Sequence, residues 1–271
     1  MHIINRDGSA ESLDLTKIVT RIKKAIDYCK NLNSLVDADV ISIKVINSLR
    51  EGITTSELDE ITSRICMNLS LEHPDWGRLG SGIIVSNHQK NVKWTFSESM
   101  EILWKEKLVS DTLWNIVSAD PVKYNKIIVK SRDFYIDYFG FKTLERSYLL
   151  KTSDGIIRET PQYLFLRVAI GIWKENLSEV LNTYNMLSNK LATHATPTLF
   201  NSGTNKNQFF SCFLLGTEDS LEGIYKTITN CAKIQKWAGG IGVHISNIRC
   251  KGSRIRGTGG KTNGIIPMLR V

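Results

Sequence analysis

Cations beside glycine-rich segments are the residues of this sequence best suited to chemistry, because together they can bind phosphate groups. Residues 223–271 hold nine Lys and Arg residues and no Asp or Glu, and they include Gly239-Gly240-Ile241-Gly242. Glycine lets the backbone approach a ligand and present N–H donors. Lys236, Arg249 and Arg256 add positive charge there. The combination favours a polyphosphate site, although such glycines also form tight turns and the cations alone would fit a solvated basic face.

A second group of candidate phosphate ligands lies near the N-terminus. Arg6, Lys17 and Lys90 are cations that a folded domain could gather around a triphosphate. Thr55 stands at a predicted helix start, where free backbone N–H groups favour anions. Asp59, one turn later, could accept a hydrogen bond from a nucleoside hydroxyl or amino group. On residue types alone, an ordinary charged surface is the alternative interpretation.

One thiol is a candidate for redox chemistry. Cys212 opens an apolar stretch and has hydroxyl side chains nearby, although a buried core cysteine is the alternative interpretation. The five cysteines are Cys29, Cys66, Cys212, Cys231 and Cys250. Their number is odd and no two form C-x-x-C, which is neither a disulfide framework nor a zinc ribbon. We therefore predict no metal site.

The composition is that of a globular protein. Of the 271 residues, 42% are hydrophobic and 23% are charged, and the net charge of +8 suggests anionic partners. No apolar run approaches the roughly 20 residues of a membrane helix, and the N-terminus lacks the apolar core of a signal peptide. We expect a soluble, cytoplasmic protein without a membrane partner. Tyr225 and Trp237 are the only aromatic residues in the basic stretch, so we do not expect nucleic-acid binding.

The first 93 residues have the pattern of a self-contained domain. Residues 3–13 predict a β-hairpin with its turn at Asp7-Gly8, and Asp14 can cap a following helix. A second helix is predicted over 37–49. Thr54-Thr55-Ser56-Glu57 is a capping-box pattern before a third helix, and a fourth helix begins after His73-Pro74 and ends near Lys93.

The next segment is predicted to be mainly helical. Thr160-Pro161 can begin a helix that runs from Gln162 to Trp173, and its nearly all-apolar surface predicts deep burial. Ser178 is the expected cap of another helix. Five aromatic residues are expected to anchor the preceding region, and the inner face of the helix after Ser178 should carry a row of apolar residues. The anchors are Phe134, Tyr135, Tyr138, Phe139 and Phe141, and the row is Val180, Leu181, Tyr184, Leu187 and Leu191.

After residue 195 the pattern changes to short apolar pieces around one helix. Residues 213–215 and 241–245 are predicted strands, and Asp219-Ser220-Leu221-Glu222 is a capping-box pattern for the helix between them. The order of strand, helix and strand predicts a parallel α/β unit.

Several of these motifs together resemble the ATP-cone, a regulatory domain of ribonucleotide reductases that binds ATP or dATP. The resemblance rests on Arg6-Asp7-Gly8, the helix around Lys17, residues 52–58 and His73-Pro74-Asp75. It implies an allosteric activity site made of Asn5, Arg6, Glu11, Ser12, Leu13, Asp14, Leu15, Thr16, Lys17, Thr55, Asp59 and Lys90. Asn5 is a departure, because relatives usually carry lysine there, and losing that cation could weaken nucleotide binding or alter the discrimination between ATP and dATP.

The later motifs resemble the large subunit of class I ribonucleotide reductase. They are A-T-P-T-L-F-N from Ala195, S-C-F-L-L from Ser211, W-A-G-G-I-G from Trp237, and the segments 257–260 and 263–271. The resemblance implies that Cys212 is one of a redox pair that reduces the ribose and becomes a disulfide. It implies substrate contacts by Thr196, Ser211 and Gly240. It also implies an allosteric specificity site made of Asp219, Ser220, Leu221, Lys236, Arg249 and Arg256.

The resemblance covers essentially the whole chain and implies its architecture. We expect an ATP-cone at 1–93, a mainly helical domain at 94–210 and, at 211–271, the first units of a ten-stranded α/β barrel. The radical cysteine, the second redox cysteine and the second specificity loop of the family lie further downstream, so we expect this chain alone to be an incomplete, inactive fragment.

The implied activity is reduction of ribonucleoside diphosphates to deoxyribonucleoside diphosphates under nucleotide control. No cofactor would be bound covalently; ATP, dATP and deoxynucleoside triphosphates would act as effectors, together with Mg²⁺. A metal-containing small subunit would supply the radical, and thioredoxin or glutaredoxin would reset the disulfide. The full-length subunit would form a homodimer or a higher oligomer. The alternative is a non-enzymatic, nucleotide-sensing regulatory protein built on an ATP-cone.

Overall fold

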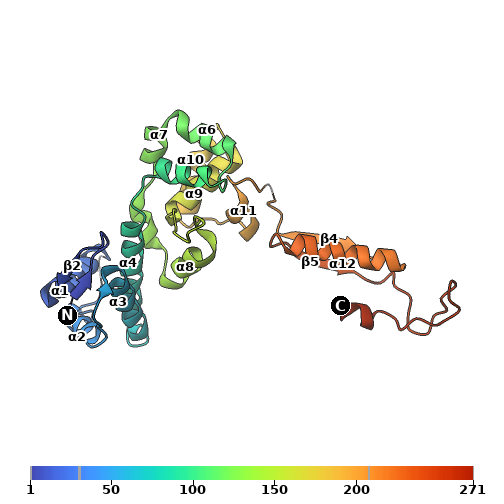
Figure 1. The fold of residues 1–271 in the computed structure, drawn as a ribbon, viewed down its shortest axis with the longest axis horizontal. Coiled ribbons are helices and arrows are strands. Elements are labelled where there is room, and N and C mark those ends of the chain that lie inside the picture. The colour runs from blue at the N-terminus through green and yellow to red at the C-terminus, as the bar shows by residue number, and fades with distance from the viewer. Residues whose placement is uncertain (1, 30–31, 207, 271) are drawn as a thin grey trace. The chain divides into compact units, whose positions relative to one another are not determined.

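The computed structural model of the chain describes residues 2–29, 32–206 and 208–270, and within these ranges it consists mostly of helices with two small sheets (Figure 1). The chain divides into two compact units. The first comprises Met1–Thr193 with Gly203–Asn205, and the second comprises His194–Ser202 with Lys206–Val271. In the part of the chain that the structure describes, no helix has the length and apolar character needed to cross a membrane.

The first unit opens with a three-stranded sheet. Strand β1 (His2–Ile4) pairs antiparallel with β2 (Ala10–Ser12), which confirms the predicted hairpin. The turn between them needs the left-handed conformation of Gly8, whose φ is +87°, and Gly8 N–H donates to the carbonyl of Asn5. A third strand, β3 (Ile53–Thr54), was not predicted from the sequence and pairs parallel with β1.

Four helices complete this N-terminal part. They are α1 (Leu15–Tyr28), α2 (Ala38–Ile46), α3 (Thr55–Leu69) and α4 (Pro74–Asn91). The predicted caps are confirmed. Asp14 accepts from Thr16 N–H, and Thr54 with Glu57 forms both hydrogen bonds of a capping box. Helices α2 and α4 end two or three residues earlier than expected.

Helices α3 and α4 cross at close range because small residues meet between them. A Cβ atom built on Gly80 would lie 2.9 Å from the carbonyl oxygen of Ser63, so only glycine fits there. Ser63 Oγ in turn donates to the Gly80 carbonyl at 2.6 Å. Around this contact lies an apolar core with fully buried Ile22, Ile41 and Leu79, each of which stabilises the fold by roughly 1.5–3 kcal/mol.

Eight further helical segments follow in the first unit. They are α5 (Phe96–Lys105), α6 (Asp111–Ala119), α7 (Pro121–Ile127), the 3₁₀ helix η1 (Lys130–Tyr135), α8 (Tyr138–Thr143), the π-helix η2 (Leu144–Tyr148), α9 (Pro161–Trp173) and α10 (Leu177–Ser188). The predicted burial of α9 is confirmed, since every residue from Pro161 to Ile170 is buried. Thr160 caps it by accepting from Tyr163 N–H, as expected.

Three expectations in this region were wrong. Asn176, not Ser178, caps α10, because its side chain is placed to accept from Glu179 N–H. Leu191 lies beyond the end of α10 and is 77% exposed. Of the expected aromatic anchors, Phe141 is fully buried, but Tyr135 and Phe139 are 56% and 71% exposed, because an aromatic residue in a helical segment packs inward only when it lies on the face that meets another element.

The second unit contains α11 (Thr196–Asn201), β4 (Cys212–Gly216), α12 (Leu221–Gln235), β5 (Gly240–His244) and α13 (Ile266–Leu269). Strands β4 and β5 are parallel, with Cys212 paired with Gly240, which confirms the predicted parallel α/β unit. The predicted capping box at 219–222 was wrong. Ser220 is the cap and accepts from Gly223 N–H, so position N3 is a glycine that has no side chain to return the bond.

Candidate functional site

A cavity of about 190 Å³ opens among β1, α1, α3 and α4 of the first unit. Its walls combine apolar side chains with four cations, three carboxylates and two hydroxyls. The lining residues are Ile3, Arg6, Glu11, Asp14, Lys17, Ile18, Arg21, Ile22, Thr55, Leu58, Asp59, Thr62, Ile83 and Lys90. An apolar wall beside convergent charged groups is typical of a site for an anionic ligand that carries a flat apolar moiety.

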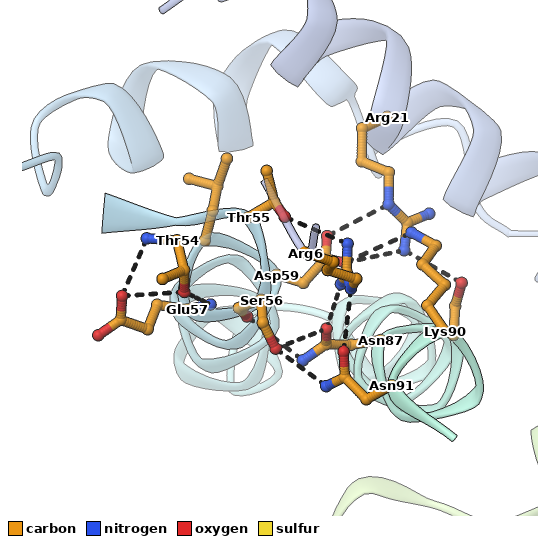
Figure 2. A network of polar contacts seen from close by, with 12 residues as sticks. Arg6, Arg21, Thr54, Thr55, Ser56, Glu57, Asp59, Asn87, Lys90 and Asn91 are labelled. Atoms are coloured by element: carbon orange, nitrogen blue, oxygen red, sulfur yellow. Dashed lines mark hydrogen bonds and ion pairs between the residues drawn. The ribbon is translucent and has the colours of Figure 1, made fainter. Parts of the chain in front are cut away.

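Arg6 holds several elements together at this cavity (Figure 2). Its Nε donates to Asn91 Oδ1 at 2.9 Å and its Nη1 donates to Thr55 Oγ1 at 3.3 Å. Its Nη2 donates to Asp59 Oδ2 at 3.1 Å and also to Asn87 Oδ1. The guanidinium is therefore fixed by the start of α3 and the end of α4, although Arg6 itself lies in the loop after β1.

Asp59 is the centre of the charged network. It is buried on α3, and its Oδ1 accepts from Arg21 Nε at 3.2 Å. Its Oδ2 faces Arg6 Nη2, Arg21 Nη2 at 3.4 Å and Lys90 Nζ at 3.5 Å. Figure 2 shows the three cations converging on this carboxylate from α1, α4 and the loop after β1.

The electrostatics of the cavity favour an anion. Burial lowers the pKa of Lys90, and the neighbouring Arg21 and Arg6 lower it further, while Asp59 acts in the opposite direction. Lys17 is more exposed and pairs with Glu11 at 3.0 Å. The N-termini of α1 and α3 also supply Asp14 and Thr55 to the lining, so their helix dipoles add positive potential there.

The structure brings together a majority of the predicted activity-site residues. Arg6, Glu11, Asp14, Lys17, Thr55, Asp59 and Lys90 line the cavity, whereas Asn5, Ser12, Leu13, Leu15 and Thr16 are not among the lining residues. Asn5 instead donates from Nδ2 to Ser9 Oγ at 3.1 Å within the hairpin turn.

Arg21, Asn87 and Asn91 belong to this network but were not among the residues predicted from the sequence. Arg21 could have been found, because it lies four residues after Lys17 and therefore on the same helical face. Asn87 and Asn91 also lie four residues apart on one helical face, but their partner Arg6 lies more than 80 residues away in the sequence.

The predicted specificity site lies in the second unit and is assembled in part. Arg249 Nε donates to Asp219 Oδ2 at 2.7 Å, and Arg249 Nη2 donates to the Asp219 carbonyl at 3.3 Å. Ser220 caps α12 beside this pair, and Leu221 is exposed. Lys236 lies at the other end of α12, about 22 Å away for a 15-residue helix. Arg256 is exposed on the loop between β5 and α13.

Three of the predicted redox and substrate residues lie together at the start of the β4–β5 pair. Cys212 is exposed, Ser211 Oγ donates to its Sγ at 3.8 Å, and Gly240 N–H donates to the Ser211 carbonyl at 2.7 Å. Thr196 is the first residue of α11. All five cysteines carry free thiols. Across residues 2–29, 32–206 and 208–270, no group of three or more His, Cys, Asp or Glu side chains is placed to hold a metal ion.

Three family comparisons cover most of the chain. Residues 1–91 match the ATP cone domain, residues 134–207 match the all-alpha domain of ribonucleotide reductase, and residues 210–271 match its barrel domain. The chain thus combines a nucleotide-binding ATP-cone with a helical domain and the start of a barrel. This confirms the fold class expected from the sequence.

Comparison with curated proteins points to the same family. The ribonucleoside-diphosphate reductase large subunit of Danio rerio is 47% identical over 282 residues, covering 100% of this chain and 35% of the relative. The corresponding subunits of Variola virus and Arabidopsis thaliana are 46% and 43% identical, again over 100% of this chain. The chain belongs to the ribonucleotide reductase large-subunit family and corresponds to its N-terminal portion. It spans about a third of the length of these relatives.

Proposed function

We propose that the cavity of the first unit is the allosteric activity site of a ribonucleotide reductase large subunit and that it binds ATP and dATP, together with Mg²⁺. The observation that carries the proposal is the convergence of Arg6, Lys17 and Lys90 on one cavity that also has an apolar wall. The cations would bind the phosphates and the apolar wall would take the base. Mg²⁺ would enter with the phosphates and keep several waters, which suits a site without a preformed metal cluster.

Calorimetric titration of the chain with ATP and with dATP tests this proposal. Both nucleotides should bind, and Lys90→Ala should weaken binding by about tenfold or more because it removes a partly buried phosphate ligand. Lys24→Ala is the matched control, since Lys24 is exposed on α1 and does not line the cavity. The absence of binding by the unmodified chain at millimolar nucleotide would refute the activity site.

The same family membership supports a proposal for the second unit. Asp219, Ser220, Leu221, Lys236, Arg249 and Arg256 would form the specificity site, which takes a deoxynucleoside triphosphate or ATP. The Asp219–Arg249 pair supports this, because it holds one cation beside the N-terminus of α12, where phosphate is favoured. Lys236 lies too far along α12 to join that pair, so it would contact another part of the effector or of the assembled subunit.

For the whole subunit we propose reduction of ribonucleoside diphosphates, with domains at 1–93, 94–210 and 211–271 as the sequence indicates. Thr196, Ser211 and Gly240 would contact the substrate. Cys212 and a second thiol would supply two electrons, the 2′-hydroxyl would leave as water and the two thiols would join in a disulfide. The radical would come from a small subunit, thioredoxin or glutaredoxin would reduce the disulfide, and the subunit would be dimeric or larger.

A turnover assay tests the role of Cys212. In a complete large subunit that carries this sequence, Cys212→Ser should abolish turnover with thioredoxin as reductant while circular dichroism remains unchanged. Cys231→Ser is the control, because Cys231 lies on α12 and not on the β4–β5 strand pair. An equal loss in both folded variants would show that Cys212 has no special role.

A further inference from the structure

Four donor contacts converge on the single carboxylate of Asp59. They come from Arg6 Nη2, from Arg21 Nε and Nη2, and from Lys90 Nζ, at 3.1 to 3.5 Å. A carboxylate offers about four lone-pair sites. Oδ2 receives three of these contacts and Oδ1 receives one, so most of the acceptor capacity of this carboxylate is already used by cations of the chain itself. This differs from the role that the sequence suggested for Asp59.

The carboxylate lies deeper than the cations that surround it. The side chain of Asp59 is 7% exposed, whereas those of Arg6, Arg21 and Lys90 are 22%, 23% and 40% exposed. An anion that enters from solvent therefore meets the cations before it meets Asp59. Lys90 is the most exposed of the three and makes the longest contact with the carboxylate, so it is the cation most easily transferred to a ligand.

The two arginines are also held by neutral partners. Arg6 donates to Asn87, Asn91 and Thr55, and Arg21 donates to Ser86 Oγ at 3.1 Å. These bonds keep both guanidinium groups at the cavity even when the carboxylate is not their main partner. Asp59 is therefore not the only group that locates the arginines, and for an anionic ligand its negative charge is a competitor.

We propose that Asp59 is a surrogate anion, which neutralises the cations of the empty cavity and competes with the phosphates of the ligand, and that Arg21 is a direct phosphate ligand. This inference rests on the proposed function of the cavity as a nucleotide site. The lining carries four cations against three carboxylates, so removing one carboxylate doubles its net positive charge. Binding of a polyanion would shift Lys90 and part of each guanidinium from Asp59 to phosphate oxygens.

Calorimetric titration with inorganic tripolyphosphate and with ATP, on the full 271-residue chain, tests the proposal. Asp59→Asn keeps the shape of the side chain and removes the competing charge, so tripolyphosphate should bind about tenfold more tightly and ATP should bind no more weakly than to the unmodified chain. Arg21→Gln should weaken both ligands about tenfold, and Arg21→Lys should recover part of the loss because it restores the charge. Asp27→Asn is the matched control, since it removes the same charge from an exposed position of α1 outside the cavity.

The outcomes separate this inference from the proposed function. If Asp59→Asn weakens ATP and leaves tripolyphosphate unchanged, Asp59 contacts the nucleoside directly and the proposal is wrong. If Arg21→Gln binds both ligands like the unmodified chain, the proposal is also wrong, and this variant decides the matter even if Asp59→Asn does not fold. If the unmodified chain binds neither ligand, the proposed function fails and this inference fails with it.

Discussion

Arg167 and Glu159 form an ion pair that is completely excluded from solvent, with Arg167 Nε 2.6 Å from Glu159 Oε1. Glu159 Oε2 also accepts from the backbone N–H of Leu150 at 2.9 Å. The pair therefore ties α9 to the chain segment before it. Because both charges are desolvated, each depends on the other.

Removing one partner of this pair should destabilise the first unit strongly. Arg167→Met leaves an uncompensated buried carboxylate and should cost about 3–5 kcal/mol of unfolding free energy in urea titrations. Adding Glu159→Gln to that variant removes the unpaired charge and should recover part of the loss. A double variant that is less stable than Arg167→Met would contradict this account.

Asp133 should make stability depend on pH. Burial raises the pKa of its carboxyl to about 6 from the ordinary 3.8. The folded chain therefore keeps a proton that the unfolded chain releases, so the stabilisation is complete below pH 3.8 and is lost as pH rises through about 6. The change amounts to about 3 kcal/mol. Urea unfolding across this pH range should show that the unmodified chain loses this stabilisation and that Asp133→Asn does not. If the free energies of unfolding of the two proteins change with pH in the same way, this account of Asp133 is wrong.

His88 should act in the opposite direction. It is buried, its Nε2 donates to the Glu159 carbonyl at 2.8 Å and its ring packs edge-on against Phe141. Burial lowers its pKa below the ordinary 6.5. As the pH falls, His88 therefore takes up a proton in the unfolded chain at a higher pH than in the folded chain. The stability that its neutral form contributes above pH 6.5 is lost as the pH falls through the lowered pKa of the folded chain. His88→Gln should remove this acid-side loss in thermal unfolding scans; an unchanged loss would place the effect elsewhere.

Gly203 and Gly155 provide a matched pair of glycine tests. Both have positive φ, +78° and +81°, but a Cβ on Gly203 would lie 2.6 Å from Leu113 Cδ1 and 2.8 Å from Arg167 Cγ, whereas a Cβ on Gly155 would meet nothing within 4 Å. Gly155→Ala should cost about 1–2 kcal/mol from backbone strain. Gly203→Ala should cost roughly 2–3 kcal/mol more because of overpacking. Equal losses in urea unfolding would contradict the close approach at Gly203.

The cysteines should differ in their reactivity. Burial raises the pKa of Cys66 to about 12 and also raises the pKa of Cys29, whereas Cys212 and Cys250 are exposed. Because the thiolate is the reactive form, iodoacetamide should label Cys212 and Cys250 first and Cys66 last. Peptide mass spectrometry over time measures the order of labelling. In concentrated urea the unfolded chain should label all five cysteines at similar rates. Early labelling of Cys66 in the folded protein would show that this thiol is not buried.

Local features of the fold could be predicted from the sequence because they depend on residues close together in the chain. The cap of α1 by Asp14 joins residues two positions apart, and the capping box of Thr54 and Glu57 joins residues three positions apart. The motifs also identified the family. Asn176 and Ser178 are both suitable caps two residues apart, and only the structure shows that Asn176 caps α10.

The cavity was decided by tertiary structure. Asp59 receives Arg21 from 38 residues away and Arg6 from 53 residues away, and Arg6 reaches Asn91 across 85 residues. Residue types alone identified Arg6 and Asp59 as separate candidates, but not as partners. Whether a carboxylate faces a ligand or a neighbouring cation depends on how the helices pack, because hydrogen bonds and ion pairs act over a few ångströms and burial sets their strength.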